Sequence, residues 1–325
     1  MQRLSPPPDR TVRRRQWPPR WLRRLRRRVP LTRRGRWVAG GAAGGVVLLV
    51  VGLTVRTGGL GDGFFGLLSG DECAATAAGV RTTLDLGQAQ RAGRIAAYAN
   101  RRGLPARAVT VVLAVELTDH DLERRAARAV RLYGRLAGVT GYRRLPVATV
   151  AARVGGGSAD SYADHEDDAR ALASALTGNS RAAFTCRVDD DREPAPDRLG
   201  PDGLVPRAER VRSDLHSAYG DLPLGGFAPG GVRTGHMEGS AHYEGRAIDV
   251  FFRPISPADK TRGWAVASYF VSQADRLDIA TVIFDDRIWT SERSDEGWRD
   301  YDPPERSGDR RILEHRDHVH VDVAD

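Results

Sequence analysis

Two short stretches of this 325-residue chain concentrate residue types that bind metals or move protons. The first, residues 240–249, contains His242 and Asp249 with Gly245 between them. The second, HRDHVHVD at residues 315–322, contains three His and two Asp. Imidazole nitrogens and carboxylate oxygens are common zinc ligands, and both groups can take a proton from water. The two stretches therefore predict a shared metal centre.

Each stretch also contains a predicted strand. Residues 247–252, AIDVFF, form an apolar run that is typical of a short buried strand and includes Asp249. Residues 318–323, HVHVDV, alternate polar and apolar side chains, so a period of two places the polar ones on one face. Two such strands facing a common cleft predict a three-ligand site with a fourth position open to water.

The alternative is that these are ordinary structural residues, as most isolated His residues are. The chain has eight His, however, and four of them fall within these two stretches. A carboxylate within an apolar strand also needs a partner, because an unpaired buried charge is costly. Both points favour a metal site.

The pattern Ser-x-His-x-x-Gly-x-Ala-x-Asp at residues 240–249 resembles the signature of the zinc D-Ala-D-Ala carboxypeptidase and L,D-endopeptidase family. That family is grouped with lysostaphin-like and hedgehog-like zinc folds, and the resemblance covers about residues 200–325. It implies His242, Asp249 and His320 as ligands of Zn2+. It also implies hydrolysis of peptidoglycan stem peptides, at D-Ala-D-Ala or at a cross-link.

The resemblance implies a catalytic base but leaves two candidates open. In the carboxypeptidase branch the base lies three residues before the last His ligand, which is Asp317 here. In the lysostaphin-like branch the first His of the His-x-His pair has a catalytic part, which is His318 here. Strict alternation would place Asp317 on the face opposite His320, so its candidacy requires the strand to begin or bulge after Asp317.

A Gly-aromatic-Arg element precedes the signature in that family, and its Arg binds the peptide carbonyl or terminal carboxylate. Arg233, in Gly231-Val-Arg233, is the best match, although Val replaces the aromatic residue. A plain surface Arg is the alternative. His236 and Glu238, just before the signature, are candidates for loop residues near the metal, but we favour a position at the surface.

The N-terminal part of the chain predicts a membrane anchor. Residues 1–36 contain fourteen Arg and one Asp, so the rest of the chain is acidic although the whole carries +8. Residues 37–55 are uncharged and long enough to span a bilayer as a helix. The positive-inside rule places the disordered tail in the cytoplasm and the later domains outside the plasma membrane. A cleaved signal peptide is the competing reading, and we expect no nucleic-acid partner.

Cys73 and Cys186 predict a disulfide in an exported chain, and they bracket a first domain at residues 73–186. We expect this domain to be small and all-α. It resembles a helical domain of exported actinobacterial cell-wall proteins that is similar to lysozyme-like transglycosylases. The substrate loop of those relatives is missing after Glu116, so we expect a non-catalytic spacer or glycan-binding remnant.

An acidic, Pro-containing linker at residues 187–199 leads to the predicted zinc peptidase-like domain, residues 200–325. Its expected elements are a helix at 206–219, a second helix capped by Ser256, and a hairpin with strands at 279–284 and 287–290. The overall prediction is an α+β chain whose C-terminal antiparallel sheet and helices carry the zinc site. An all-α domain and a single transmembrane helix precede it.

Two other functions are compatible with the same residues. One is a zinc-containing cell-wall-binding or scaffolding module that does not hydrolyse its ligand. The other is a structural anchor between membrane and wall, in which the site would be incidental. A base beside the metal favours the enzyme, whereas a blocked groove would favour binding.

Overall fold

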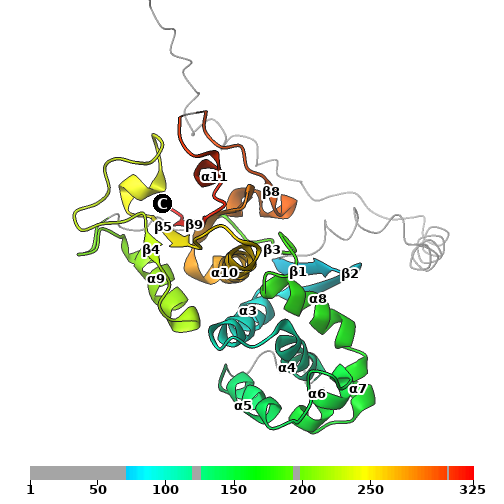
Figure 1. Ribbon diagram of the computed structural model, residues 1–325. Helices are drawn as coiled ribbons and strands as arrows, with labels where there is room; N and C mark the ends of the chain where they lie inside the picture. The colour runs from blue at the N-terminus through cyan, green and yellow to red at the C-terminus, as the bar shows by residue number, and fades with distance from the viewer. Residues whose placement is uncertain (1–70, 119–125, 193–197, 306) are drawn as a thin grey trace, which may run out of the picture. The chain divides into compact units, whose positions relative to one another are not determined.

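The computed structural model describes residues 71–118, 126–192, 198–305 and 307–325. They belong to one compact unit, Leu67–Asp325, with a helical region and two antiparallel sheets (Figure 1). Within these ranges no helix has the length and apolar character needed to cross a membrane. The predicted tail at 1–36 and the predicted transmembrane helix at 37–55 lie outside the described residues.

A three-stranded antiparallel sheet in the order β2-β1-β3 opens the described part. Its strands are β1 (Glu72–Ala77), β2 (Val80–Asp85) and β3 (Phe184–Cys186). The helices between β2 and β3 are α3 (Leu86–Arg101), α4 (Ala106–Thr118), α5 (Ala126–Ala137), α6 (Val147–Gly155), α7 (Ala159–Ala163) and α8 (Glu166–Leu176). The prediction of an all-α region at 73–186 is therefore wrong. The missed strands are short and rich in Ala and Thr, and β3 depends on pairing with a strand about 110 residues earlier.

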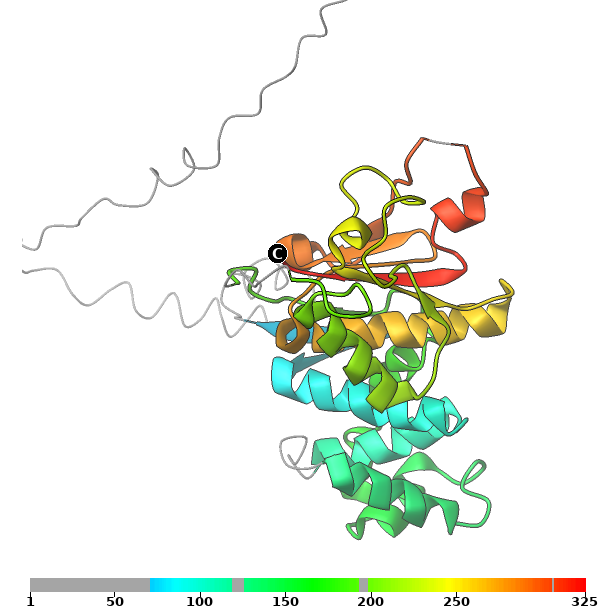
Figure 2. The ribbon, with the colours of Figure 1, turned by 90° about the vertical axis from the view of Figure 1, so that its left-hand side faces the viewer.

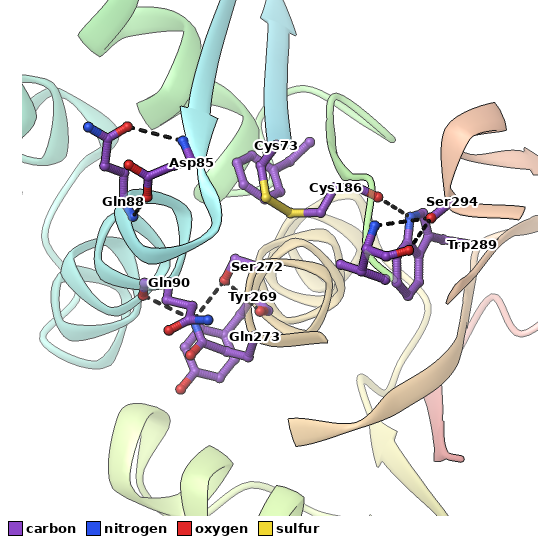
Figure 3. Close-up of a disulfide and its surroundings, with 12 residues drawn as sticks. Cys73, Asp85, Gln88, Gln90, Cys186, Tyr269, Ser272, Gln273, Trp289 and Ser294 are labelled. Carbon is purple, nitrogen blue, oxygen red and sulfur yellow. Dashed lines mark hydrogen bonds between the residues drawn. A yellow bond between two sulfur atoms is a disulfide. The ribbon is translucent and has the colours of Figure 1, made fainter. Parts of the chain in front are cut away.

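The predicted disulfide between Cys73 and Cys186 is present (Figure 3). The two residues are register partners on β1 and β3, and both are buried. The indole Nε1–H of Trp289 donates a hydrogen bond to the carbonyl oxygen of Cys186 at 3.2 Å. This bond connects the disulfide to the second sheet.

The second sheet has six strands in the order β4-β5-β9-β6-β7-β8. They are β4 (Leu224–Gly225), β5 (Ala247–Phe251), β6 (Ile279–Phe284), β7 (Arg287–Thr290), β8 (Arg299–Asp300) and β9 (His318–Val323). The accompanying helices are α9 (Pro206–Tyr219), α10 (Pro257–Leu277) and α11 (Arg310–Leu313), with 3₁₀ turns η2 (Ala241–Glu244) and η3 (Ser291–Glu296). The predicted helix at 206–219 and the predicted hairpin match α9 and the β6–β7 pair. Ser256 caps α10 as predicted, because its Oγ accepts from the backbone N–H of Asp259 at 3.1 Å.

Helix α10 lies between the second sheet and α3 (Figure 2). Toward α3, the side-chain amide of Gln273 donates to the carbonyl oxygen of Gln90 at 3.0 Å and to Ser272 Oγ at 2.9 Å (Figure 3). Toward the sheet, α10 contacts β6 and β9, and the valines of β9 are fully buried in the same core. The alternate residues of β9 are therefore left on the face away from this core, where the predicted ligands lie.

Candidate metal centre

The pairing of β5 with β9 sets the geometry of the site. Asp249 lies directly opposite His320, and Phe251 lies opposite His318. Directly opposed residues on one face have Cβ atoms about 4.5–5.5 Å apart, which brings an imidazole and a carboxylate into contact. The register of β5 and β9 therefore brings residues of the two motifs together in one cluster.

His242 comes from the 3₁₀ turn η2, just before β5. Ser240 caps this turn, and its Oγ accepts from the backbone N–H of His242 at 3.4 Å. Gly245 ends the turn with a φ of 68°, a left-handed conformation that Gly adopts without steric cost. The chain then enters β5 at Ala247, so His242 and Asp249 converge from a turn and a strand.

The predicted ligand atoms of His242, Asp249 and His320 lie almost equally far apart. His242 Nε2 is 3.1 Å from His320 Nδ1 and 3.2 Å from Asp249 Oδ1. His320 Nδ1 is 3.3 Å from Asp249 Oδ1. Zinc bonds of about 2.0–2.1 Å in a tetrahedron place ligand atoms roughly 3.3–3.4 Å apart. The three atoms therefore fit three corners of a zinc tetrahedron.

The outer nitrogens of the His242 and His320 imidazoles are held by oxygen atoms. His242 Nδ1–H donates to the carbonyl oxygen of Gly226 at 2.7 Å. His320 Nε2–H donates to Asp322 Oδ2 at 3.2 Å. Such bonds fix the tautomer and aim the other nitrogen of each ring inward, as the outer partners of metal-bound His do.

The charges of the cluster also favour a cation. Burial raises the pKa of Asp249, but its contacts with His242 and His320 outweigh burial and hold that pKa well below its ordinary value. Burial lowers the pKa of His320, whereas Asp249 and Asp322 raise it, to about 9. Without a metal, the His320 imidazole is therefore protonated on both nitrogens, with Nδ1 facing Asp249 and Nε2 facing Asp322. A divalent cation would replace the proton on His320 Nδ1, because a metal ion displaces the protons of the groups that bind it.

His318 lies beside the cluster but is held differently. Its Nδ1–H donates to Asp317 Oδ1 at 2.7 Å, and its Nε2 lies 3.9 Å from Asp249 Oδ1. Asp317 precedes β9, which begins at His318, so its side chain is not bound by strand alternation. The carboxylate of Asp317 contacts His318 and also Arg253, with Oδ2 at 2.7 Å from Arg253 Nε.

His236 also reaches the centre, so the alternative of a loop residue near the metal holds for it, and not the favoured surface position. One ligand atom each of His236, His242 and Asp249 lie within 4.8 Å of one another, so these residues form a group that could hold a metal ion. The His236 ring, however, stacks on His242, with centroids 3.9 Å apart and planes 26° apart. Two imidazoles on one tetrahedral ion have centroids roughly 5 Å apart, given bonds of about 2.0–2.1 Å. The His242–His320 pair, at 4.9 Å and 68°, fits that geometry more closely.

Arg233 and Glu238 are exposed on the loop that carries His236. The loop is tied to the signature through Tyr243, whose hydroxyl accepts from the backbone N–H of His236 at 3.0 Å. His315 also lies against the centre, with its ring centroid 4.6 Å from that of His318. The position of His236 and the contact of Arg253 with Asp317 are tertiary features, and no local sequence pattern predicted either.

Fold and site together define an α+β protein with a buried His/Asp group that could hold a metal ion. Residues 200–311, about a third of the chain, match a family model described as VldE, C-terminal domain. This match includes His236, His242 and Asp249 and ends before Asp317. No curated protein and no solved structure matches the chain. The assignment to the D-Ala-D-Ala carboxypeptidase and L,D-endopeptidase family is therefore wrong, because the matched region is similar to a different family.

Gly226 offers a test of the centre that alters no ligand. Its φ is 80°, and a Cβ there would overlap the imidazole of His242 and lie 3.0 Å from Asp249 Oδ2. We expect Gly226→Ala to weaken zinc binding by about 10- to 100-fold, the usual effect of losing an outer partner. Competition with a chromophoric chelator would measure the affinity.

Gly230→Ala is the matched control. Gly230 has the same φ of 80°, but the space around its Cβ position is open. Both variants carry similar backbone strain, and only Gly226→Ala disturbs His242. Equal zinc affinities for the two variants would contradict the proposed ligand arrangement.

Proposed function

We propose that this chain is a zinc-dependent hydrolase that cleaves peptide bonds in peptidoglycan stem peptides. The arrangement of His242, Asp249 and His320 carries the proposal, because their inward atoms match three corners of a tetrahedron. Three protein ligands and one open position are typical of catalytic zinc sites, whereas structural sites usually have four protein ligands.

The residues of the chain have separable roles in this reaction. His242, Asp249 and His320 would hold the zinc, which when bound would polarise a carbonyl group and lower the pKa of a water molecule to about 7. His318 Nε2 then accepts the proton of the attacking water and later gives it to the leaving amine. Asp317 accepts from His318 Nδ1–H and keeps that ring in the required tautomer, as the carboxylate of a Ser-His-Asp triad does.

The surroundings of Asp317 favour its role in orienting His318. Burial raises its pKa, but hydrogen bonds from His318 and Arg253 outweigh burial and lower the pKa below its ordinary value. An ionised Asp317 accepts protons poorly and orients His318 well. We therefore assign the base to His318 rather than to Asp317.

The disulfide supports the proposed location and, through it, the proposed substrate. The buried Cys73–Cys186 disulfide is typical of an oxidising compartment outside the cytoplasm. A protein anchored through residues 37–55 on the outer face of the plasma membrane would meet peptidoglycan directly. Glu116 is buried on α4 with Arg128 3.6 Å away, which supports a structural role for this carboxylate.

A zinc-containing wall-binding module is the second candidate. It is favoured by the burial of the ligands, since His242, Asp249 and His320 are only 2%, 6% and 7% exposed. The His236 ring stacked on His242 covers the centre further. Under this proposal the chain would bind a stem peptide or glycan without cutting it.

Incubating the zinc-loaded full chain with stem pentapeptides and cross-linked muropeptides would separate the two candidates. We expect release of D-Ala or loss of the cross-link by mass spectrometry, and no reaction after chelation of zinc. Peptide binding without cleavage would support the wall-binding module. Neither binding nor cleavage of any stem peptide would overturn the proposed substrate.

A further inference from the structure

Arg253 is a basic residue near the centre. The proposed reaction uses only its contact with Asp317. It follows β5, where the backbone N–H of Phe252 donates to the carbonyl oxygen of Asp317 at 2.8 Å and extends the pairing with β9. Its Nε–H donates to Asp317 Oδ2 at 2.7 Å. Its guanidinium lies over the ring of Phe251, 4.3 Å from the centroid. The guanidinium group is thus held at one edge by Asp317 and on one face by Phe251.

The rest of this guanidinium faces solvent. The Arg253 side chain is 54% exposed, and among the described residues Asp317 is its acidic partner, contacted through Nε. Nearby Arg316, in contrast, is shared among Glu314, Asp285 and Asp286. Arg253 therefore has terminal N–H groups left for a ligand, in an orientation that Asp317 and Phe251 fix in advance.

The position of Arg253 relates these N–H groups to the reacting bond. Asp317 contacts Arg253 with one oxygen and His318 with the other, and His318 Nε2 lies 3.9 Å from Asp249 Oδ1. One carboxylate and one imidazole thus separate the guanidinium from the ligand cluster. The contacts along this path measure 2.7, 2.7 and 3.9 Å. At up to ~3.6 Å per residue, a peptide group at the guanidinium would lie within a few residues of the scissile carbonyl.

We propose that Arg253 binds a carboxylate of the substrate, so that the centre prefers peptides with an acidic group within a few residues of the scissile bond. Planar guanidinium groups bind carboxylates through paired N–H donors, which gives both affinity and orientation. The carboxylate is either the C-terminus or an acidic side chain of the peptide. This inference rests on the proposed function and names the substrate feature that the same site recognises.

The test compares wild-type full chain with Arg253→Gln on two pairs of stem peptides. One pair differs only in a C-terminal acid or amide, and the other in a side-chain acid or amide. We expect the acid-over-amide preference in kcat/KM to fall about 10- to 100-fold in the variant, mostly through KM. The pair in which it falls identifies the carboxylate. Arg253→Lys is expected to retain part of the preference, because it keeps the charge without the planar fork.

Arg262→Gln is the matched control, since Arg262 also lies over a Phe ring, that of Phe252, and pairs with an acid three residues away. It should keep the wild-type preference. A fall in kcat that is equal for acid and amide peptides, with an unchanged preference, would overturn the inference and leave Arg253 acting only through Asp317.

If the wild-type chain cleaves none of these peptides, calorimetry on the zinc-loaded protein still decides the inference. Tighter binding of an acid peptide than of its amide, abolished in Arg253→Gln, would support the carboxylate site even though the proposed hydrolysis had failed. Equal binding of acid and amide would overturn it.

Discussion

Replacing His320 with Gln is expected to lower zinc affinity by on the order of 100- to 1,000-fold. Structural zinc sites with four ligands bind with roughly 10–16 kcal/mol, so one ligand contributes about 2.5–4 kcal/mol. His236→Ala is expected to change the affinity by less than about 10-fold, because His236 stacks on His242 instead of converging with it. Chelator competition and zinc content by mass spectrometry would measure both variants.

The control for this prediction is His216→Gln. His216 is exposed on α9 and pairs with Asp221, so its loss should leave zinc binding unchanged. A greater loss in His236→Ala than in His320→Gln would show that the metal is held by His236, His242 and Asp249 instead. Circular dichroism would verify that each variant is folded.

The site could be predicted from sequence as far as local geometry determines it. The alternation in residues 318–323 fixes which side chains of β9 face away from the core. The signature has a comparable physical meaning. Ser240 caps a turn, Gly245 reverses the chain in a left-handed conformation, and Ala247 lies opposite Asp322 in the sheet. A long polar side chain at 247 would compete for the space beside Asp322.

The same reasoning explains why the signature misled about the family. Its residues specify a cap, a turn and a strand that bring one His and one Asp together. Residues 200–311 meet these demands while matching a family model for a different domain, the C-terminal domain of VldE. The motif thus predicted the arrangement of His242 and Asp249 but not the relationship of the chain.

Features that depend on distant contacts could not be predicted. Strand β3 has three residues and is positioned by β1 and the disulfide, so its own sequence carries little strand signal. Arg253 is oriented by the carboxylate of Asp317, 64 residues later. In both cases the partner becomes a neighbour only after the sheet has formed.

Replacing His318 with Gln is expected to lower kcat for peptide hydrolysis by about 100- to 10,000-fold while zinc content stays at one equivalent. The size follows from the loss of general acid–base catalysis. Zinc should be retained because His318 Nε2, 3.9 Å from Asp249 Oδ1, lies outside the tetrahedral spacing of the three ligands. Single-turnover kinetics with zinc measured on the same sample would test both parts.

Asp317→Asn decides between the two candidate bases. If His318 is the base, both variants lose activity, because an Asn at 317 no longer favours the tautomer with a proton on His318 Nδ1. If Asp317 were the base, His318→Gln would keep most of its activity and only Asp317→Asn would lose it. Loss of zinc in His318→Gln would also contradict the assignment of His318 as the base. It would show that His318 is a fourth metal ligand, and the centre would then have no open position.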